Sequence, residues 1–212
     1  MKSAVLVTLS ENKHWITHDV TDLLRREGAT LVQSYTTKLG SLYGEQFQFE
    51  AREVDLEHIR VAVTTELPRD WNIILRECEP APATPKENVH KLTIYAFDQP
   101  GVVQQVTRAV SSSDIDILGM AGCQYPAPHV GGHLFVLEIT LDVPRGSAAR
   151  ALRSAMATIV DANGWDFDLE AMDSSDAQSA SLPFPPSRAT AEHSLQLIPG
   201  GLHRSSRQQV AG

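Results

Sequence analysis

The sequence predicts an α+β protein made of two β-α-β-β-α-β units, each an antiparallel four-stranded sheet with two helices on one face, followed by a disordered tail. Two observations lead to this fold class. The same order of strand-like and helix-like segments occurs twice along the chain, at an offset of roughly 88 residues. Between the two copies, residues 79–85 are rich in proline, and such a stretch is stiff, extended and typical of a linker between domains.

The predicted domain boundaries follow from these shifts in composition. We expect a first unit at residues 1–78, a linker at 79–87, a second unit at 88–170 and a tail at 171–212. The tail is rich in Ser, Ala, Pro, Gln and Gly and has almost no hydrophobic periodicity. Such a composition does not supply a hydrophobic core, so the sequence predicts a disordered tail.

In the first unit, the apolar run at residues 4–9 predicts a strand, and the polar residues 10–13 predict the turn that leads into a helix. Gly28 is a natural C-cap for that helix. The segment that follows predicts a strand at 30–39 and a turn at 40–44. The last three elements are a strictly alternating strand at 46–50, a short helix through Leu56, Ile59 and Val63, and a strand at 71–75.

In the second unit, the turn between the first strand and the first helix reads Asp98-Gln99-Pro100-Gly101. Asp98 suits a helix cap, and Pro100 suits a first-turn position because it has no amide hydrogen to leave unpaired. The expected strands lie at 91–97, 115–124, 133–142 and 165–170, and the expected helices at 101–112 and 147–160.

This Asp-x-Pro-Gly turn, followed by Ile-Asp-Ile at the start of the next strand, resembles the ACT family of ferredoxin-like domains. The resemblance implies small modules that bind amino acids and regulate other proteins. It implies that backbone amides around Gly101 and Val102 bind the ligand carboxylate, and that an acceptor such as Asp98 binds its ammonium group. The alternative is that Asp98, Pro100 and Gly101 only cap the helix. The candidate ligand-binding residues are Asp98, Gln99, Pro100, Gly101, Val102, Ile115 and Ile117.

The first unit departs from this motif. Its turn reads Ser10-Glu11-Asn12-Lys13 and has no glycine, which would let the backbone approach a carboxylate closely. Lys13 cannot reproduce that approach. We therefore expect an altered or lost site at Ser10, Glu11, Asn12 and Lys13.

The presence of two ACT-like units without a catalytic domain narrows the resemblance to one family. Residues 38–47, the strand pair within 124–140 and the proline-rich linker resemble the family of glycine cleavage system transcriptional repressors. The resemblance covers residues 1–170. It implies a protein that senses glycine or a similar small amino acid and regulates a LysR-type transcription factor by direct contact, without binding DNA. It also implies pairing of ACT sheets or helices, either within one chain or in a homodimer.

The charge distribution agrees with a protein-mediated role. The net charge is −8, and the acidic and basic residues of the tail balance each other, so the whole excess lies on residues 1–170. Such an acidic body repels phosphate, which disfavours direct binding of DNA or RNA. No apolar run is long enough to span a bilayer, and the N-terminus lacks the pattern of a signal segment. We expect a soluble protein of the cytoplasm without a membrane partner.

The sequence predicts no catalytic residues, no metal site and no cofactor. Cys78 and Cys123 are too far apart for a disulfide framework or a zinc site of known spacing, and His14 and His18 have no third ligand in sight. Motifs for a nucleophile or a phosphate loop are absent. Two alternatives to a transcriptional role stay open. One is a regulatory subunit or scaffold of an amino-acid metabolic enzyme. The other is a small ferredoxin-like enzyme, which a polar cluster in a closed pocket would favour.

Overall fold

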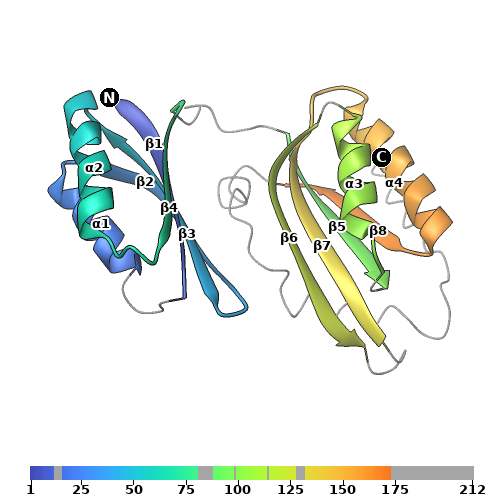
Figure 1. Cartoon of the computed structure of the whole chain (residues 1–212). Helices are drawn as coiled ribbons and strands as arrows, with labels where there is room; N and C mark the ends of the chain where they lie inside the picture. Colours follow the sequence, from blue (N-terminus) through green and yellow to red (C-terminus); the bar gives the residue numbers. More distant parts are fainter. Residues whose placement is uncertain (12–15, 81–87, 98, 114, 128–131, 173–212) are drawn as a thin grey trace. The chain divides into compact units, whose positions relative to one another are not determined.

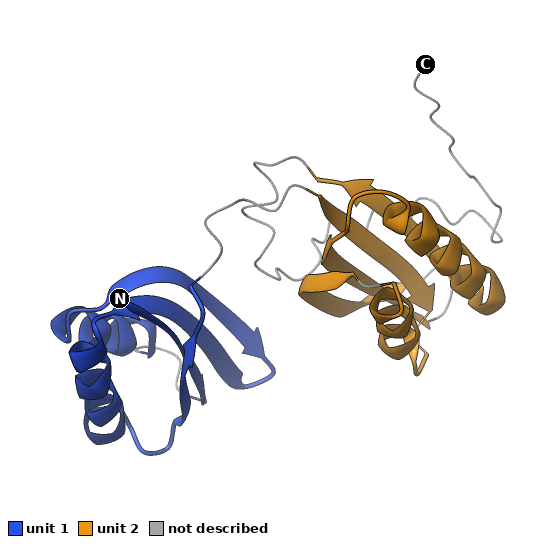
Figure 2. Cartoon of the chain, turned by 90° about the horizontal axis from the view of Figure 1, so that it is seen from above, with its two compact units in different colours: residues 1–83 blue, residues 84–212 orange. Residues whose placement is uncertain are grey.

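The computed structural model describes residues 1–11, 16–80, 88–97, 99–113, 115–127 and 132–172. The chain divides into two compact units, residues 1–83 and 84–212 (Figure 2). Each unit is treated by itself below. Within the described ranges, no helix has the length and apolar character that a membrane crossing requires.

Unit 1 has the predicted order of elements. Its antiparallel sheet has the strand order β2-β3-β1-β4, and Figure 1 shows α1 and α2 on one face of it. The elements are β1 (Lys2–Ser10), α1 (Ile16–Arg26), β2 (Thr30–Leu39), β3 (Leu42–Ala51), α2 (Glu53–Glu66) and β4 (Asn72–Cys78).

Unit 2 repeats this topology. Its antiparallel sheet has the strand order β6-β7-β5-β8, with α3 and α4 on one face (Figure 1). The elements are β5 (Val89–Phe97), α3 (Val102–Ser111), β6 (Asp116–Ala127), β7 (Gly132–Asp142), α4 (Ala148–Asn163) and β8 (Asp166–Ala171). The predicted fold class, an α+β chain of two β-α-β-β-α-β units, is therefore confirmed. The predicted tail lies outside the described residues from 173 onward.

Each unit has its own hydrophobic core between the sheet and its two helices. In unit 1, Leu6 of β1 and Phe47 of β3 are fully buried, and in unit 2 the same holds for Ile94 of β5. Successive residues of a strand point to opposite faces, so the alternating apolar residues form the covered face of each sheet. The helices bury their apolar stripes on that face.

The registers of the central strands relate the two units residue by residue. Leu6 pairs with Phe47 in unit 1, and Ile94 pairs with Leu137 in unit 2. Both pairs lie at the centre of the covered face, so positions two residues further along correspond as well. The correspondences that matter below are Thr8 with Ala96, Glu45 with Phe135, and Thr36 with Gln124.

One predicted connection is wrong. The turn expected at 40–44 is shorter, because β3 begins at Leu42 and Leu39 pairs directly with it. Gly40 and Ser41 form a two-residue hairpin loop, and Gly40 has a φ of 62°. Such loops need positive φ values, which glycine adopts without strain.

We predict that Ile94→Ala lowers the stability of unit 2 alone. Ile94 is fully buried, and removing such a side chain costs about 2–5 kcal/mol because a cavity remains. The matched variant Leu6→Ala is expected to act in the same way on unit 1. Urea unfolding of variants that keep only Trp71 of unit 1 or only Trp165 of unit 2, both of which are buried, measures each unit separately. If each substitution lowered both midpoints equally, the units would not unfold independently.

Candidate functional site

The turn that connects β5 to α3 is organised by Gly101. This residue is the N-cap of α3 and has a φ of 96°, in the left-handed region, without a side-chain cap hydrogen bond. Pro100 precedes the N-cap, so its expected place in the first helical turn is wrong. Proline fixes φ near −65°, and the positive φ at this reversal requires the glycine that follows. Asp98 lies outside the described residues, so its capping role stays a prediction.

The start of α3 presents backbone donors. The carbonyl oxygen of Gly101 accepts the first helical hydrogen bond, from the amide of Gln105 at 2.9 Å. An α-helix offers no intrahelical acceptor to the amides before that point, which here belong to Val102, Val103 and Gln104. The helix dipole adds partial positive charge at the same end. The first turn of α3 therefore favours an anionic group such as a carboxylate.

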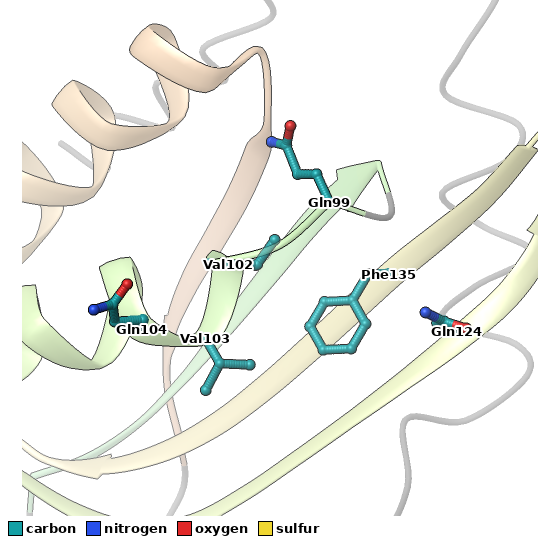
Figure 3. A pocket seen from close by; sticks show the side chains of 7 residues that line it. Gln99, Val102, Val103, Gln104, Gln124 and Phe135 are labelled. Atoms are coloured by element: carbon teal, nitrogen blue, oxygen red, sulfur yellow. The ribbon is translucent and has the colours of Figure 1, made fainter.

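A hollow of about 460 Å³ lies beside this helix start (Figure 3). Figure 3 shows the ring of Phe135 between Val103 and Gln124, which come from three different elements. No charged side chain is among the described residues that line the hollow. Its volume is within the range of sites for small organic ligands. The lining residues are Gln99, Gly101, Val102, Val103, Gln104, Gln124 and Phe135.

The lining combines an apolar surface with amide groups. Val103 and Phe135 supply the apolar part, and the lining also includes three glutamines, whose amide groups can both donate and accept hydrogen bonds. This arrangement can orient a small polar ligand, and it offers no strong acid or base among its described residues.

Gly122 of β6 determines where the Phe135 ring lies. A Cβ atom at position 122 would lie 2.7 Å from Cζ of Phe135 and 3.3 Å from its Cε2. Real Cβ atoms are essentially never that close to a ring carbon, so only glycine leaves the ring its place over β6. The open side of the hollow therefore depends on a residue that does not line it.

The structure brings together part of the predicted ligand-binding set. Gln99, Gly101 and Val102 line the hollow, and Pro100 lies between them without lining it. The lining residues that the sequence did not single out are Val103, Gln104, Gln124 and Phe135. The first two follow Val102 directly, whereas the last two come from strands whose register cannot be read from a local motif.

Ile115 and Ile117 do not line the hollow. Ile115 is buried in the core of unit 2, and Ile117 pairs with Leu141 near the start of β6. Gln124, which does line the hollow, lies seven residues further along β6, or about 23 Å at roughly 3.3 Å per residue. The helix α3 carries the chain back along the sheet, so the strand that follows begins at the other end.

In unit 1, the corresponding place is occupied by polar side chains, which we call the threonine–glutamate cluster: Thr8, Thr17, Thr36 and Glu45. Glu45 is only 4% exposed, on the face of β3 that the helices cover. Its Oε1 accepts a hydrogen bond of 2.6 Å from Oγ1 of Thr17, in the first turn of α1. Alignment of the buried residues of α1 and α3 matches Thr17 with Val103.

The electrostatics of this cluster are unusual for a core position. Burial raises the pKa of Glu45, and hydrogen bonding by Thr17 and Thr36 opposes this without cancelling it. Oε2 of Glu45 and Oγ1 of Thr8 are buried and have no hydrogen-bond partner among the described residues. None of these four residues was predicted from the sequence to belong to a site.

The altered site predicted at residues 10–13 is only partly described. Ser10 is buried at the end of β1, and Glu11 after it is exposed. Asn12 and Lys13 lie outside the described residues. The loss of an amino-acid site at this turn therefore stays a prediction.

The comparisons with known proteins agree on the fold. No protein-family model matches the sequence, and no curated protein matches it. A solved structure of an unknown protein from Galdieria sulphuraria is 22% identical with a TM-score of 0.71, over 81% of this chain and 99% of that one. Another, assigned as a glycine cleavage system transcriptional repressor, is 13% identical with a TM-score of 0.63, over 81% and 98%. The shared fold is a tandem of two β-α-β-β-α-β units.

We predict that Glu45 makes unit 1 less stable as the pH rises. Its folded pKa lies above the ordinary value of 4.5, so the folded state holds the proton more tightly than the unfolded state. The free energy of unfolding therefore falls as the pH rises from 4.5 through the folded pKa, and is constant above it. Glu45→Gln removes this dependence. Urea midpoints of unit 1 from about pH 4 to about pH 8 measure it.

The control for this experiment is Glu50→Gln. Glu50 lies on the same strand but on the opposite face, where it pairs with Ser3. Its substitution is expected to leave the pH dependence of unit 1 as it is in the wild type. Identical pH profiles for wild type and Glu45→Gln would contradict the raised pKa.

We predict that Gly122→Ala displaces the half-buried Phe135 ring and destabilises unit 2 by about 1 kcal/mol, at the low end of what overpacking costs, because the site is not fully buried. Gly132→Ala is the matched control, because a Cβ at that glycine meets nothing within 4 Å. In the double variant Gly122→Ala, Phe135→Leu, the smaller side chain is expected to restore part of the loss. Urea unfolding of unit 2 measures all three, and equal stability of Gly122→Ala and wild type would contradict the close contact.

Proposed function

We propose that this chain is an amino-acid-sensing regulatory protein and that unit 2 binds the amino acid. The observation that carries the proposal is the position of the hollow. It lies against the first turn of α3, where Gly101 is the N-cap and no side chain caps the helix (Figure 3). A ligand carboxylate is thus offered backbone donors and the positive end of a helix dipole at once.

The rest of the hollow suits the other parts of a small amino acid. The side-chain oxygens of Gln99 and Gln124 are acceptors for an ammonium group, and Asp98 is proposed as a further acceptor. Val103 and Phe135 leave an apolar surface for at most a short side chain. We therefore propose glycine or a similarly small amino acid as the effector.

The proposed output is contact with a protein partner. One structure with this fold is assigned as a glycine cleavage system transcriptional repressor, and the net charge of −8 on this chain opposes direct contact with DNA. We propose a LysR-type transcription factor as the partner. A homodimer is proposed as the working form, because the edge strands β2 and β6 each leave one row of backbone groups for pairing.

The first alternative is a regulatory subunit or scaffold for an enzyme of amino-acid metabolism. In that case the same hollow would bind the effector, and only the protein partner would differ. A small ferredoxin-like enzyme is less well supported. The threonine–glutamate cluster is polar and closed, but a carboxylate is a weak base for the hydroxyl of Thr17.

We predict that glycine binds saturably in isothermal titration of the full chain. Gln124→Leu removes an amide from the hollow and is expected to weaken binding by about tenfold or more, as the loss of a hydrogen bond to a charged group does. Gly101→Lys places a side chain at a φ of 96° and is expected to abolish binding. The other amino acids are titrated next to establish selectivity.

Gln33→Leu is the control for these variants. Gln33 lies on β2, the edge strand of unit 1 that corresponds to β6, and its substitution is expected to leave glycine binding intact. Thermal unfolding verifies that Gly101→Lys is folded. The absence of heat with every amino acid at millimolar concentration would contradict the sensing role and favour a scaffold.

A further inference from the structure

The two units carry different side chains at equivalent positions beside the first helix. Where unit 2 has the ring of Phe135 beside its hollow, unit 1 has the carboxylate of Glu45. The position of Ala96 in unit 2 is taken by Thr8 in unit 1. The fold is the same in both units, so they differ at these positions in the chemical character of their side chains.

A buried carboxylate is energetically unfavourable at this position. Phe47 and Phe49, the next two residues of β3 on the covered face after Glu45, are both fully buried. In unit 2 the equivalent position is taken by an aromatic ring, that of Phe135. Burying a charged or polar group costs free energy unless its hydrogen bonds are made. The carboxylate therefore needs partners that the hydrophobic core does not provide.

Thr17 and Thr36 supply some of those partners, because both side chains hydrogen-bond to the Glu45 carboxylate. The hydroxyl of Thr17 donates to Oε1 of Glu45, which fixes the orientation of the carboxylate. Within the described part of the chain, the second oxygen, Oε2, has no hydrogen-bond partner, and neither has Oγ1 of Thr8 on the adjacent strand. Thr8 is 0% exposed. Two buried oxygen atoms on neighbouring strands are thus left as acceptors, and one belongs to an ionisable group.

We propose that unit 1 carries a second binding site, in which Oε2 of Glu45 and Oγ1 of Thr8 accept hydrogen bonds from a compact ammonium group. An ammonium group has several N–H donors on one small cation, so it can satisfy both oxygens and the charge of the carboxylate together. Thr17 is a positioning residue in this site, because it orients the carboxylate through Oε1. The proposal stands independently of amino-acid binding in unit 2.

The chemistry is the reverse of that proposed for unit 2. Unit 2 offers backbone donors at the start of α3 to an anionic group, whereas unit 1 offers acceptors to a cationic group. The ammonium group has two possible sources, a free ammonium ion or a small organic amine. The probes below separate these sources.

The test is isothermal titration of the full chain with ammonium chloride and with methylammonium chloride, with potassium chloride as the control salt. We expect saturable binding of at least one of the two ammonium probes to the wild type and none of potassium. Glu45→Gln keeps the shape of the side chain and is expected to weaken binding by about tenfold or more. Thr17→Val, which mimics unit 2, is expected to weaken binding less and to retain the same ratio of affinities for the two probes.

The control variant is Glu50→Gln, which removes a carboxylate from the other face of β3 and is expected to bind the probes as the wild type does. Binding of ammonium alone identifies the free ion, and binding of methylammonium identifies an organic amine; both support the site. Three results would overturn it: no saturable heat with either ammonium probe, equal affinity in Glu45→Gln and wild type, or binding of potassium with the same dependence on Glu45. Glycine binding that survives in Glu45→Gln and is lost in Gln124→Leu separates this site from that of unit 2.

Discussion

The register between the two central strands of each sheet is the constraint on which the rest of the structure depends. Each sheet has one face covered by helices, and side chains alternate between faces, so a slip of one residue would exchange the buried set for the exposed set. The pairs of Leu6 with Phe47 and of Ile94 with Leu137 fix that choice in unit 1 and unit 2. The same registers then determine which side chains stand at the end of the sheet, beside the first turn of the helix.

The two units share this arrangement of strands but differ in the side chains beside the start of the first helix. In unit 2 the place beside the helix start is apolar with amide groups around it, and a glycine at the helix N-cap leaves the backbone accessible. In unit 1 the same place holds a carboxylate and hydroxyl groups. The duplication preserved the packing that stabilises each unit while the side chains at one end of each sheet diverged. Similarity of fold therefore says little about what either unit binds.

The sequence predicts the elements well and the site only in part. Alternation and helical spacing are local, so the strands, the helices and their order could be read directly. The hollow is not local, because Gln124 and Phe135 reach it through strand pairing, and α3 moves Ile115 and Ile117 to the other end of the sheet. Glu45 is a different case. It has the same parity as Phe47 and Phe49, so the alternation that predicted the strand also placed a carboxylate on its buried face, and this signal was available.

The close approach of Gly122 to the Phe135 ring has a consequence for the ligand selectivity of such a site. The Phe135 ring lies over β6 because Gly122 has no side chain there. The space left in the hollow therefore depends on Gly122, which does not itself line the hollow. In the proposed sensor, a mutation at position 122 would alter selectivity without touching the bound amino acid. Comparisons of tandem proteins that consider only the residues in contact with an effector would overlook this position.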